Sequence, residues 1–272
     1  FPLDGKQLII TSPQDMTPIG LEFHAGNGTL CLMGRYDPES GFTRERAQAI
    51  DYGLDFYAPQ TLEAPDGRRI MVAWMQNWDT VGGRPSYCRW FGQMTLPREL
   101  SVENGRLYQR PVRELEAYRR DPVVHHHILV SGETNLPGVQ GRTLDMTVIV
   151  SPMGEGSYRW FRLHLAKDGQ HDTIIRYKPG ESTLKLDRTH SGLPRDIVHT
   201  RSFLVRPQGG KLKLRVILDR FSVEVFVNDG EQAASAVIYT RQEADAITFE
   251  ADGQVLVDVE KYGLFFDGGR ED

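Results

Sequence analysis

Polar and apolar residues alternate with a period of two in most of the strongly patterned segments of the chain. Residues 211–216 read Lys-Leu-Lys-Leu-Arg-Val, which puts the apolar side chains on one face of an extended strand. Residues 222–227 resume the alternation, and residues 228–230 (Asn-Asp-Gly) then tolerate the positive φ of a hairpin turn. Residues 144–148 and 255–259 read the same way. Short strands, frequent turns and almost no helical periodicity predict an all-β protein.

One short segment has helical spacing and separates two regions of different character. Pro111 suits a first helical turn, and apolar residues follow at intervals of three. We therefore expect a short linker helix over 111–122. Residues 1–110, with three of the four tryptophans, would form one β domain. Residues 123–263 are long enough for a two-sheet β-sandwich with its own core, followed by a tail over 264–272.

Charge and composition argue against several classes of partner. The chain has 32 Lys and Arg against 37 Asp and Glu, a net charge of −5, whereas nucleic-acid binders need a basic face. The longest apolar run, Ile70–Met75, is far shorter than the roughly 20 residues of a membrane-spanning helix. We expect neither nucleic acid nor a membrane as partner. Cys31 and Cys88 are the only cysteines, and we expect buried thiols and a cytoplasmic location.

Residues 125–127 are three consecutive histidines, which raises the question of a metal. Neighbouring residues on a strand point to opposite faces, so three in a row cannot converge on one ion in regular structure. The sequence therefore predicts no metal site, and nothing in it indicates a cofactor.

Four segments have a joint pattern that is more specific than any of them alone. They are Phe-Pro-Leu at 1–3, Asp-Tyr-Gly-Leu-Asp-Phe-Tyr-Ala-Pro-Gln-Thr at 51–61, Val-Ala-Trp-Met-Gln-Asn-Trp at 72–78 followed by Gly-Gln-Met-Thr-Leu-Pro-Arg-Glu-Leu at 92–100, and Ser-Val-Glu-Val-Phe-Val-Asn-Asp-Gly at 222–230. Together they resemble the C-terminal portion of glycoside hydrolase family 32, the invertases, β-fructofuranosidases and sucrose-6-phosphate hydrolases. The resemblance extends over about 1–263.

The resemblance implies a five-bladed β-propeller followed by a β-sandwich. Residues 1–110 would be the last two blades or so, because the chain enters the family pattern partway along. An isolated pair of blades leaves strand edges exposed, so the missing N-terminal blades would come from the same or another chain. We interpret Phe1 accordingly as a point within a longer polypeptide.

The family's chemistry needs two carboxyl groups, one to attack the anomeric carbon and one to protonate the leaving oxygen. In the family these groups lie in Asn-Asp-Pro-Asn-Gly and Glu-Cys-Pro-Asp motifs, and a further Asp of an Arg-Asp-Pro motif binds sugar hydroxyls. None of these motifs occurs here in its proper place. We expect the catalytic carboxylates upstream of Phe1 and predict that residues 1–272 alone are inactive. Residues 120–122 spell Arg-Asp-Pro, but they follow the propeller segments, and we interpret them as a linker turn.

Four residues are candidates for contact with a small carbohydrate substrate. Asp55 and Tyr57 stand two apart on a predicted strand and so point the same way, which the resemblance implies is toward the propeller's central cavity. Trp74 and Trp78 suit a sugar subsite, because an indole face stacks on the apolar face of a sugar ring. The alternative is structural: a strand-end Asp, a packed Tyr and core tryptophans.

Other residues of the matching segments have weaker indications. Residues 87–90, with Tyr87, Arg89 and Trp90, are expected to border the site entrance. Arg98 and Glu99 are expected to form a structural ion pair or a strand-end brace. Glu224 alternates with apolar neighbours, so we expect it to face away from the core as a solvated or bridging residue.

The resulting hypothesis is part of a retaining glycosidase that hydrolyses β-fructosidic bonds. Sucrose, sucrose 6-phosphate and short fructans are all compatible substrates, and transfer to a sugar acceptor is a variant of the same chemistry. The alternative is a non-catalytic carbohydrate-binding or structural β module. The residues that precede Phe1 in the natural protein would separate the two hypotheses.

Overall fold

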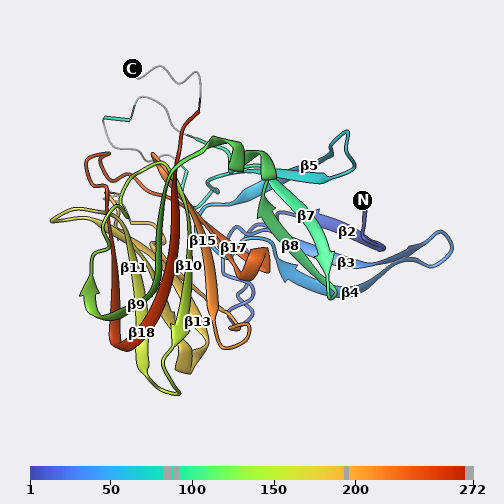
Figure 1. Cartoon of the computed structure of the whole chain (residues 1–272). Helices are drawn as coiled ribbons and strands as arrows, with labels where there is room; N and C mark the ends of the chain where they lie inside the picture. Colours follow the sequence, from blue (N-terminus) through green and yellow to red (C-terminus); the bar gives the residue numbers. More distant parts are fainter. Residues whose placement is uncertain (82–86, 89–91, 193–195, 267–272) are drawn as a thin grey trace.

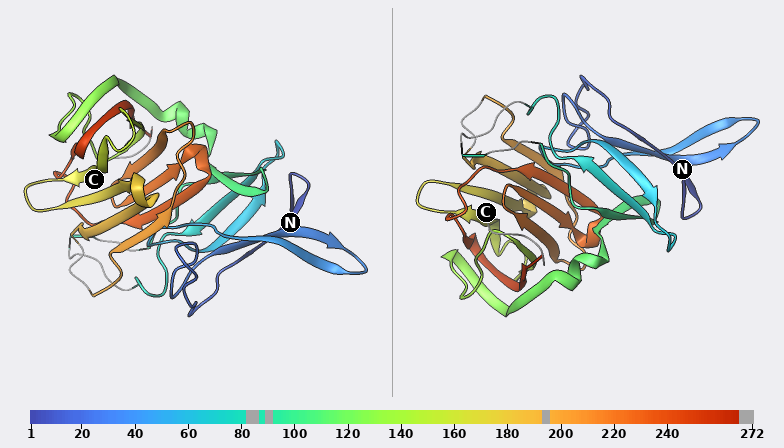
Figure 2. Two further views of the ribbon diagram at one scale, coloured as in Figure 1. Left: turned by 90° about the horizontal axis from the view of Figure 1, so that it is seen from below. Right: turned by 90° about the horizontal axis from the view of Figure 1, so that it is seen from above.

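The computed structural model describes residues 1–81, 87, 88, 92–192 and 196–266. Within them the chain forms two four-stranded sheets, one ten-stranded sheet and three short 3-10 helices. Figure 1 shows the two small sheets projecting from one side of the large one. Seen from above and below in Figure 2, they lie beside each other on that same side. The prediction of an all-β protein is confirmed, and every segment with strong alternation contributes to a strand.

The two small sheets are antiparallel meanders of consecutive strands, the arrangement of a propeller blade. The strands of the first sheet, in spatial order, are β1 (Pro2–Leu3), β2 (Lys6–Thr11), β3 (Leu30–Asp37) and β4 (Gly41–Ala49). Those of the second are β5 (Tyr57–Glu63), β6 (Arg69–Trp74), β7 (Arg98–Glu103) and β8 (Arg106–Pro111). A shared apolar cluster joins them: Leu8, Cys31, Met33, Ile50, Phe56, Met71, Ala73, Leu100 and Leu107.

The expected linker helix is shorter and tighter than the sequence suggested. It is a six-residue 3-10 helix, η1 (Arg113–Tyr118), and no side chain caps its N-terminus. Pro111 still belongs to β8, and residues 119–122 already belong to β9 (Arg119–Thr134) because they pair with the last strand of the sheet. The Arg-Asp-Pro tripeptide is therefore part of a strand and not a linker turn, with Asp121 at a φ of 51°.

The ten-stranded sheet is the remainder of the described chain. Its central path runs β14-β13-β12-β11-β18-β10-β15-β16-β17, and β9 pairs with β18 outside that path. A 3-10 helix, η2 (Pro179–Glu181), links β12 to β13, and η3 (Asn228–Gly230) forms the predicted positive-φ turn between β16 and β17. The strand bounds are β10 (Leu144–Pro152), β11 (Tyr158–Lys167), β12 (Asp172–Lys178), β13 (Thr183–His190), β14 (Thr200–Leu204), β15 (Leu212–Asp219), β16 (Ser222–Val227), β17 (Gln232–Val237) and β18 (Ala246–Leu264).

The long strand β18 folds this sheet into two layers. One of its edges pairs with β9, while the other pairs first with β11 and then, after Gly253, with β10. Gly253 has a φ of 114°, and a Cβ there would lie 2.3 Å from the carbonyl oxygen of Ser157, so a side chain is excluded at the bend. The single hydrogen-bonded sheet therefore closes on itself as a sandwich.

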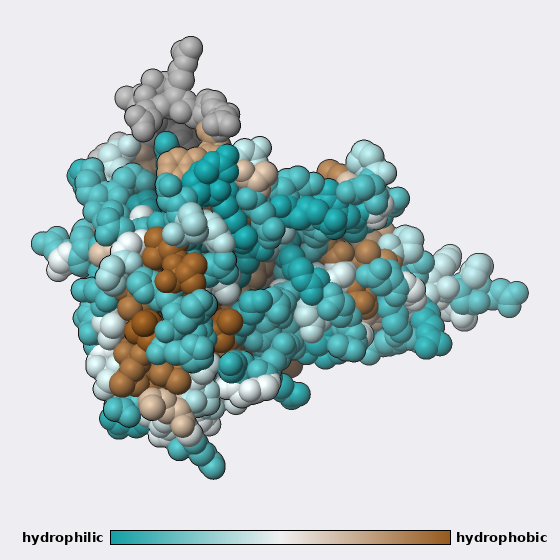
Figure 3. Space-filling view, in the orientation of Figure 1, coloured by the Kyte–Doolittle hydropathy of each residue, from teal (hydrophilic) through white to brown (hydrophobic). Residues whose placement is uncertain are grey.

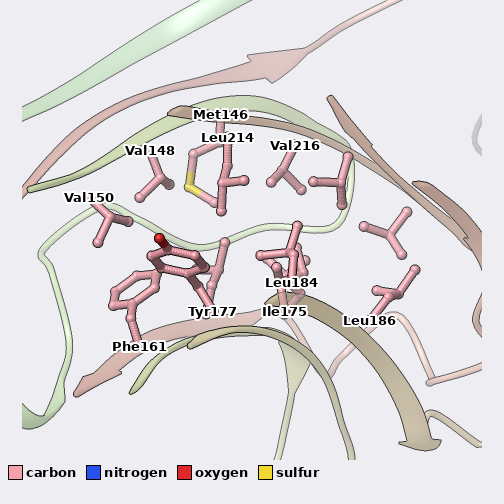
Figure 4. Close-up of a cluster of buried hydrophobic side chains, with 14 of the residues drawn as sticks. Met146, Val148, Val150, Phe161, Ile175, Tyr177, Leu184, Leu186, Leu214 and Val216 are labelled. Atoms are coloured by element: carbon pink, nitrogen blue, oxygen red, sulfur yellow. The ribbon is translucent and has the colours of Figure 1, made fainter. Parts of the chain in front are cut away.

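The core of the sandwich lies between these two layers. In Figure 4, side chains of β10 and β15 face side chains of β11, β12 and β13 across the gap. The labelled residues are all buried: Met146, Val148, Val150, Phe161, Ile175, Tyr177, Leu184, Leu186, Leu214 and Val216. Alternation along each strand puts these residues inside and leaves their neighbours toward the outer face. The face of the molecule in Figure 3 is largely hydrophilic, with apolar side chains gathered on the lower part of the sandwich.

Candidate functional site

The two blades meet the sandwich along its edge strand β17. The backbone N–H groups of Tyr52 and Leu54 donate to the carbonyl oxygens of Ala233 (2.8 Å) and Ser235 (2.7 Å). This contact covers an edge that would otherwise expose unpaired backbone groups. Gly53 makes the approach possible, because a Cβ there would lie 2.1 Å from the backbone nitrogen of Ser235.

Trp74 and Trp78 lie in contact with each other. Trp74 ends β6, and the two ring centroids are 5.3 Å apart at an interplanar angle of 69°, an edge-to-face contact. Trp78 is 56% exposed, whereas Trp74 is partly buried. An indole that is exposed on one side and supported on the other is a surface on which a sugar ring can stack. Contact with substrate stays a prediction for both residues.

Polar side chains hold the turn that presents Trp78. Asn77 donates from Nδ2 to the carbonyl oxygen of Leu54 at 2.8 Å, and its Oδ1 accepts from the backbone of Asp79 at 2.8 Å. Asp79 in turn accepts from Nδ2 of Asn27 at 2.8 Å. The turn is thus attached to the segment before β3 and to the segment before β5. Neither Asn77 nor Asp79 was expected to have a role from the sequence, although both flank Trp78.

The sandwich supports the segment that follows. Gln93 donates from Nε2 to the carbonyl oxygen of Phe221 at 3.1 Å. Cys88 is buried in an apolar cluster with Met75 and Tyr239, as expected for a structural thiol. The sandwich therefore contacts the chain at Cys88 and at Gln93.

Of the three predicted entrance residues, the structure describes Tyr87. The hydroxyl of Tyr87 donates to the carbonyl oxygen of Tyr239, so this side chain contacts the sandwich. Arg89 and Trp90 lie outside the described residues. Cys31 is buried, and burial raises the pKa of its thiol to about 12, which disfavours the thiolate that nucleophilic chemistry needs.

Asp55 and Tyr57 are close in the sequence but have different partners. Asp55 lies in a bend before β5 and not on the strand, because the chain turns there to follow β17. Its carboxylate is fully buried, pairs with Arg188 of β13 and accepts from the backbone of Val237 at 2.8 Å. Tyr57 begins β5, and its hydroxyl donates to the carbonyl oxygen of Ser12 at 2.7 Å. Direct contact of either side chain with a sugar stays a prediction.

A buried guanidinium joins the blades to the sandwich. Arg98 is fully buried; its Nη2 lies 2.6 Å from Oε2 of Glu224, and both of its Nη atoms donate to Oδ2 of Asp51 at 3.1 Å. Glu224 is therefore a bridging residue and not a solvated one. Alternation placed it correctly on the outer face of the sandwich, but the blades cover that face. Burial raises the pKa of the Glu224 carboxyl, and the charge of Arg98 opposes the shift.

The same guanidinium is also held by neutral groups. Its carbon lies 4.8 Å from the ring centroid of Phe56 and 5.1 Å from that of Phe226. Arg98 and Glu99 do not pair with each other, since adjacent residues of β7 point to opposite faces. Glu99 instead pairs with Arg113 at 2.9 Å on the outside of the blade. The prediction of an ion pair between them is wrong, although each of them pairs with other residues.

The buried carboxylates of the described residues share one property: each of them pairs with an arginine, and Arg98 is shared by two of them. Asp145 pairs with Arg119 and Arg215, at 2.8 and 2.7 Å. The others, described above, are Asp51, Asp55 and Glu224. A retaining glycosidase needs one carboxylate free to attack and a second one about 5–5.5 Å away to protonate the leaving group. Each of these four side chains is instead held by at least one arginine.

The histidine triplet departs from regular strand geometry. His127 has a φ of 52° in an irregular part of β9, and this brings Nδ1 of both His126 and His127 to within 3.6 and 3.5 Å of Oδ1 of Asp258. Two adjacent histidines therefore lie near one carboxylate, while the third, His125, bonds to the carbonyl oxygen of Pro137 at 2.9 Å. No group of three or more candidate ligands for a metal ion occurs within the described residues.

Comparison with known proteins accounts for nearly the whole chain. Residues 1–111 match the model of the "Glycosyl hydrolases family 32 N-terminal domain", and residues 114–262 match that of "Glycosyl hydrolases family 32 C terminal". The chain belongs to glycosyl hydrolase family 32. In this family 32 protein, no helix among the described residues has the length and apolar character needed to cross a membrane.

Relatives of this family 32 chain include enzymes of known name. It is 37% identical over 258 residues to a raffinose invertase of Escherichia coli, covering 92% of this chain and 51% of that protein. It is 32% identical to a sucrose-6-phosphate hydrolase of Staphylococcus xylosus, covering 97% and 53%. The crystal structure of an exo-inulinase from Aspergillus awamori superimposes with a TM-score of 0.81 at 24% identity, covering 97% and 55%, which shows the fold. The chain thus spans about half the length of these relatives.

Proposed function

We propose that residues 1–272 are the C-terminal part of a retaining glycosidase that hydrolyses the β-fructosidic bonds of sucrose, sucrose 6-phosphate or short fructans. The observation that supports this most strongly is the family 32 match over both regions of the chain. A raffinose invertase and a sucrose-6-phosphate hydrolase among the relatives favour this substrate class. The chemistry is a double displacement through a fructosyl-enzyme.

In this proposal the two small sheets are the last two blades or so of a five-bladed propeller. The open edge of β5 supports it, since within the described residues β5 pairs only with β6. Two apolar side chains of the small sheets, Ile9 of β2 and Leu62 of β5, are also exposed. An unpaired edge with exposed apolar residues is a liability that a neighbouring blade would remove. That blade comes from the same or another chain.

The catalytic carboxylates then belong to the blades beyond residues 1–272. The arginine pairing of Asp51, Asp55, Asp145 and Glu224 supports this assignment, because it leaves none of these buried side chains available as nucleophile or acid. The chain contributes one wall of the pocket. Trp78 stacks on a sugar ring, and Trp74 supports it from behind. Asp55 and Tyr57 hold the backbone where the chain enters β5.

Two measurements test this proposal. Purified residues 1–272 are expected to release no fructose from sucrose, whereas the protein from the complete reading frame releases it. In the complete protein, Trp78→Ala should raise KM about tenfold through the loss of stacking. Tyr36→Ala, which removes an exposed aromatic ring from β3, is the matched control and should leave KM unchanged. Fructose release by residues 1–272 alone would overturn the proposal, and inactivity of the complete protein would favour a non-catalytic module.

A further inference from the structure

A groove of about 740 Å³ lies at the end of the sandwich where β12 turns into β13. Its walls are the 153–157 turn, the start of β11, the η2 turn and β18 at Asp252. The volume is in the range of small-molecule and oligosaccharide sites. None of its lining residues belongs to the candidate site at Trp74 and Trp78.

The groove is well separated from that site. Thr183 begins β13 next to the groove, and Arg188 of the same strand reaches Asp55 at the other end. Five residues of extended strand span roughly 17 Å. A ligand in the groove therefore does not touch the segment that holds the tryptophan pair.

An aromatic ring lines the groove and is held in place from one side. Trp160 is partly exposed, and the guanidinium carbon of Arg162 lies 4.0 Å from its ring centroid. Arg162 is itself held by Glu250 at 3.1 Å. One face of the indole is thus occupied by a fixed cation, and the ring is oriented before any ligand arrives. Trp160 is one of the residues that line the groove.

A β-bulge directs a polar side chain to the same place. The register of β11 against β18 shifts between Tyr158 and Trp160, so Arg159 is the extra residue. Its side chain is 82% exposed and pairs with Asp252 at 2.7 Å. Such bulges recur where the direction of a side chain must change. Here the bulge directs the side chain of Arg159 along the rim of the groove.

The charges around the groove define the chemical class of ligand. Two cations, Arg159 and Lys178, face three anions, Glu155, Glu181 and Asp252. A polyanion is disfavoured by this balance. Surface ion pairs such as Lys178–Glu181 contribute little stability, so their donors and acceptors are available to hydroxyl groups at small cost. A flat aromatic ring beside such donors and acceptors fits a neutral sugar.

We propose that the groove around Trp160 is a second carbohydrate site, which holds a neutral oligosaccharide on the sandwich, away from the site of bond cleavage. The sugar ring stacks on Trp160, and its hydroxyls bond to the Arg159–Asp252 and Lys178–Glu181 pairs. A fructan as ligand rests on the proposed function, whereas the site itself rests only on the geometry of the groove.

The test is a titration of residues 1–272 with a fructo-oligosaccharide of four to six units and, separately, with maltohexaose. Binding is followed by calorimetry and by the amide NMR signals of Gly156 and Gly180. We expect at least one of these sugars to bind and to shift both signals. Trp160→Ala should weaken binding about tenfold, while Trp160→Phe, which keeps a flat ring, retains most of it. Thermal unfolding of each variant confirms that it is folded.

Three results would overturn the proposal. They are no binding of either sugar by the wild-type chain, equal affinity in Trp160→Ala, or loss of binding in Trp78→Ala but not in Trp160→Ala. Binding of maltohexaose alone would leave the site in place and remove the link to fructans. Failure of the proposed hydrolysis is seen separately as the absence of fructose release by the complete protein.

Discussion

The sandwich and the two blades are built from the same antiparallel hairpins but are completed in different ways. The sandwich closes its core between its own layers, because β18 pairs with strands of both. The blades leave the edge of β5 open within the described residues, and the sandwich covers their buried arginine, Arg98. The two regions therefore differ in their edges and not in having a core: the blades have an apolar cluster of their own, and the cluster of the sandwich also includes Tyr52 and Leu54 from the blade region.

Removal of the guanidinium at the junction should have the largest effect. Arg98→Met leaves the carboxylates of Glu224 and Asp51 buried without their cation, and losing one partner of a buried pair typically costs about 3–5 kcal/mol. Urea unfolding should show this loss in the free energy of unfolding. The matched control is Arg113→Met, which breaks the outer pair with Glu99 and should cost no more than about 1 kcal/mol.

A small effect of Arg98→Met, similar to that of the control, would mean that the junction tolerates uncompensated charge. The position of the blades would then not depend on the contacts of Arg98 with the sandwich. Hydrogen exchange adds a second readout: amides of the blades should lose protection in Arg98→Met before amides of the sandwich core do.

The difference between the regions also explains what could be predicted from the sequence. Alternation located the strands of the sandwich because each of them has one face in a core made by its own layers. The same rule put Glu224 on the outer face, yet the blades bury that face, and no local pattern reports such a contact. Trp74 and Trp78 were candidates by residue type alone, and their contact depends on how the chain turns after β6.

The errors have local causes of two kinds. Asp55 was placed on a strand, but the chain bends there to pair with β17, which is a tertiary requirement. The histidine triplet was treated as regular strand, but the irregular register of β9 turns two rings toward Asp258. Bulges and edge contacts depend on a partner strand distant in the sequence. Periodicity within one segment cannot show them.

Substitution of Gly53 at the junction is expected to lower the free energy of unfolding by an intermediate amount. Gly53→Ala would place a Cβ 2.1 Å from both the backbone nitrogen and the carbonyl oxygen of Ser235, so the blades must move away from β17. We expect a loss of about 1–3 kcal/mol, as for other overpacked sites. Gly154→Ala, where a Cβ meets nothing within 4 Å, should stay within about 0.5 kcal/mol of the wild type.

The readout for these variants is thermal unfolding together with exchange of the Leu54 amide, which donates to Ser235 in the wild type. Faster exchange in Gly53→Ala is expected if the blades separate locally from β17. Equal stability of the two glycine variants would show that the junction is loose and that the blades keep their position by other contacts.

The smallest expected effect concerns the outer ion pair of the blades and its dependence on pH. Hydrogen bonds from Arg113 hold the pKa of the Glu99 carboxyl at about 2, below its ordinary 4.5. A carboxyl with a lowered pKa in the folded protein stabilises it fully above about pH 4.5, and this contribution is lost as the pH falls toward 2. Because the pair is solvated, the contribution is at most about 1 kcal/mol.

Unfolding curves between pH 5 and 2 should therefore fall slightly more steeply for the wild type than for Glu99→Gln. Parallel curves would show that this outer pair adds nothing, which would leave the junction with the sandwich as the measurable electrostatic support of the blades.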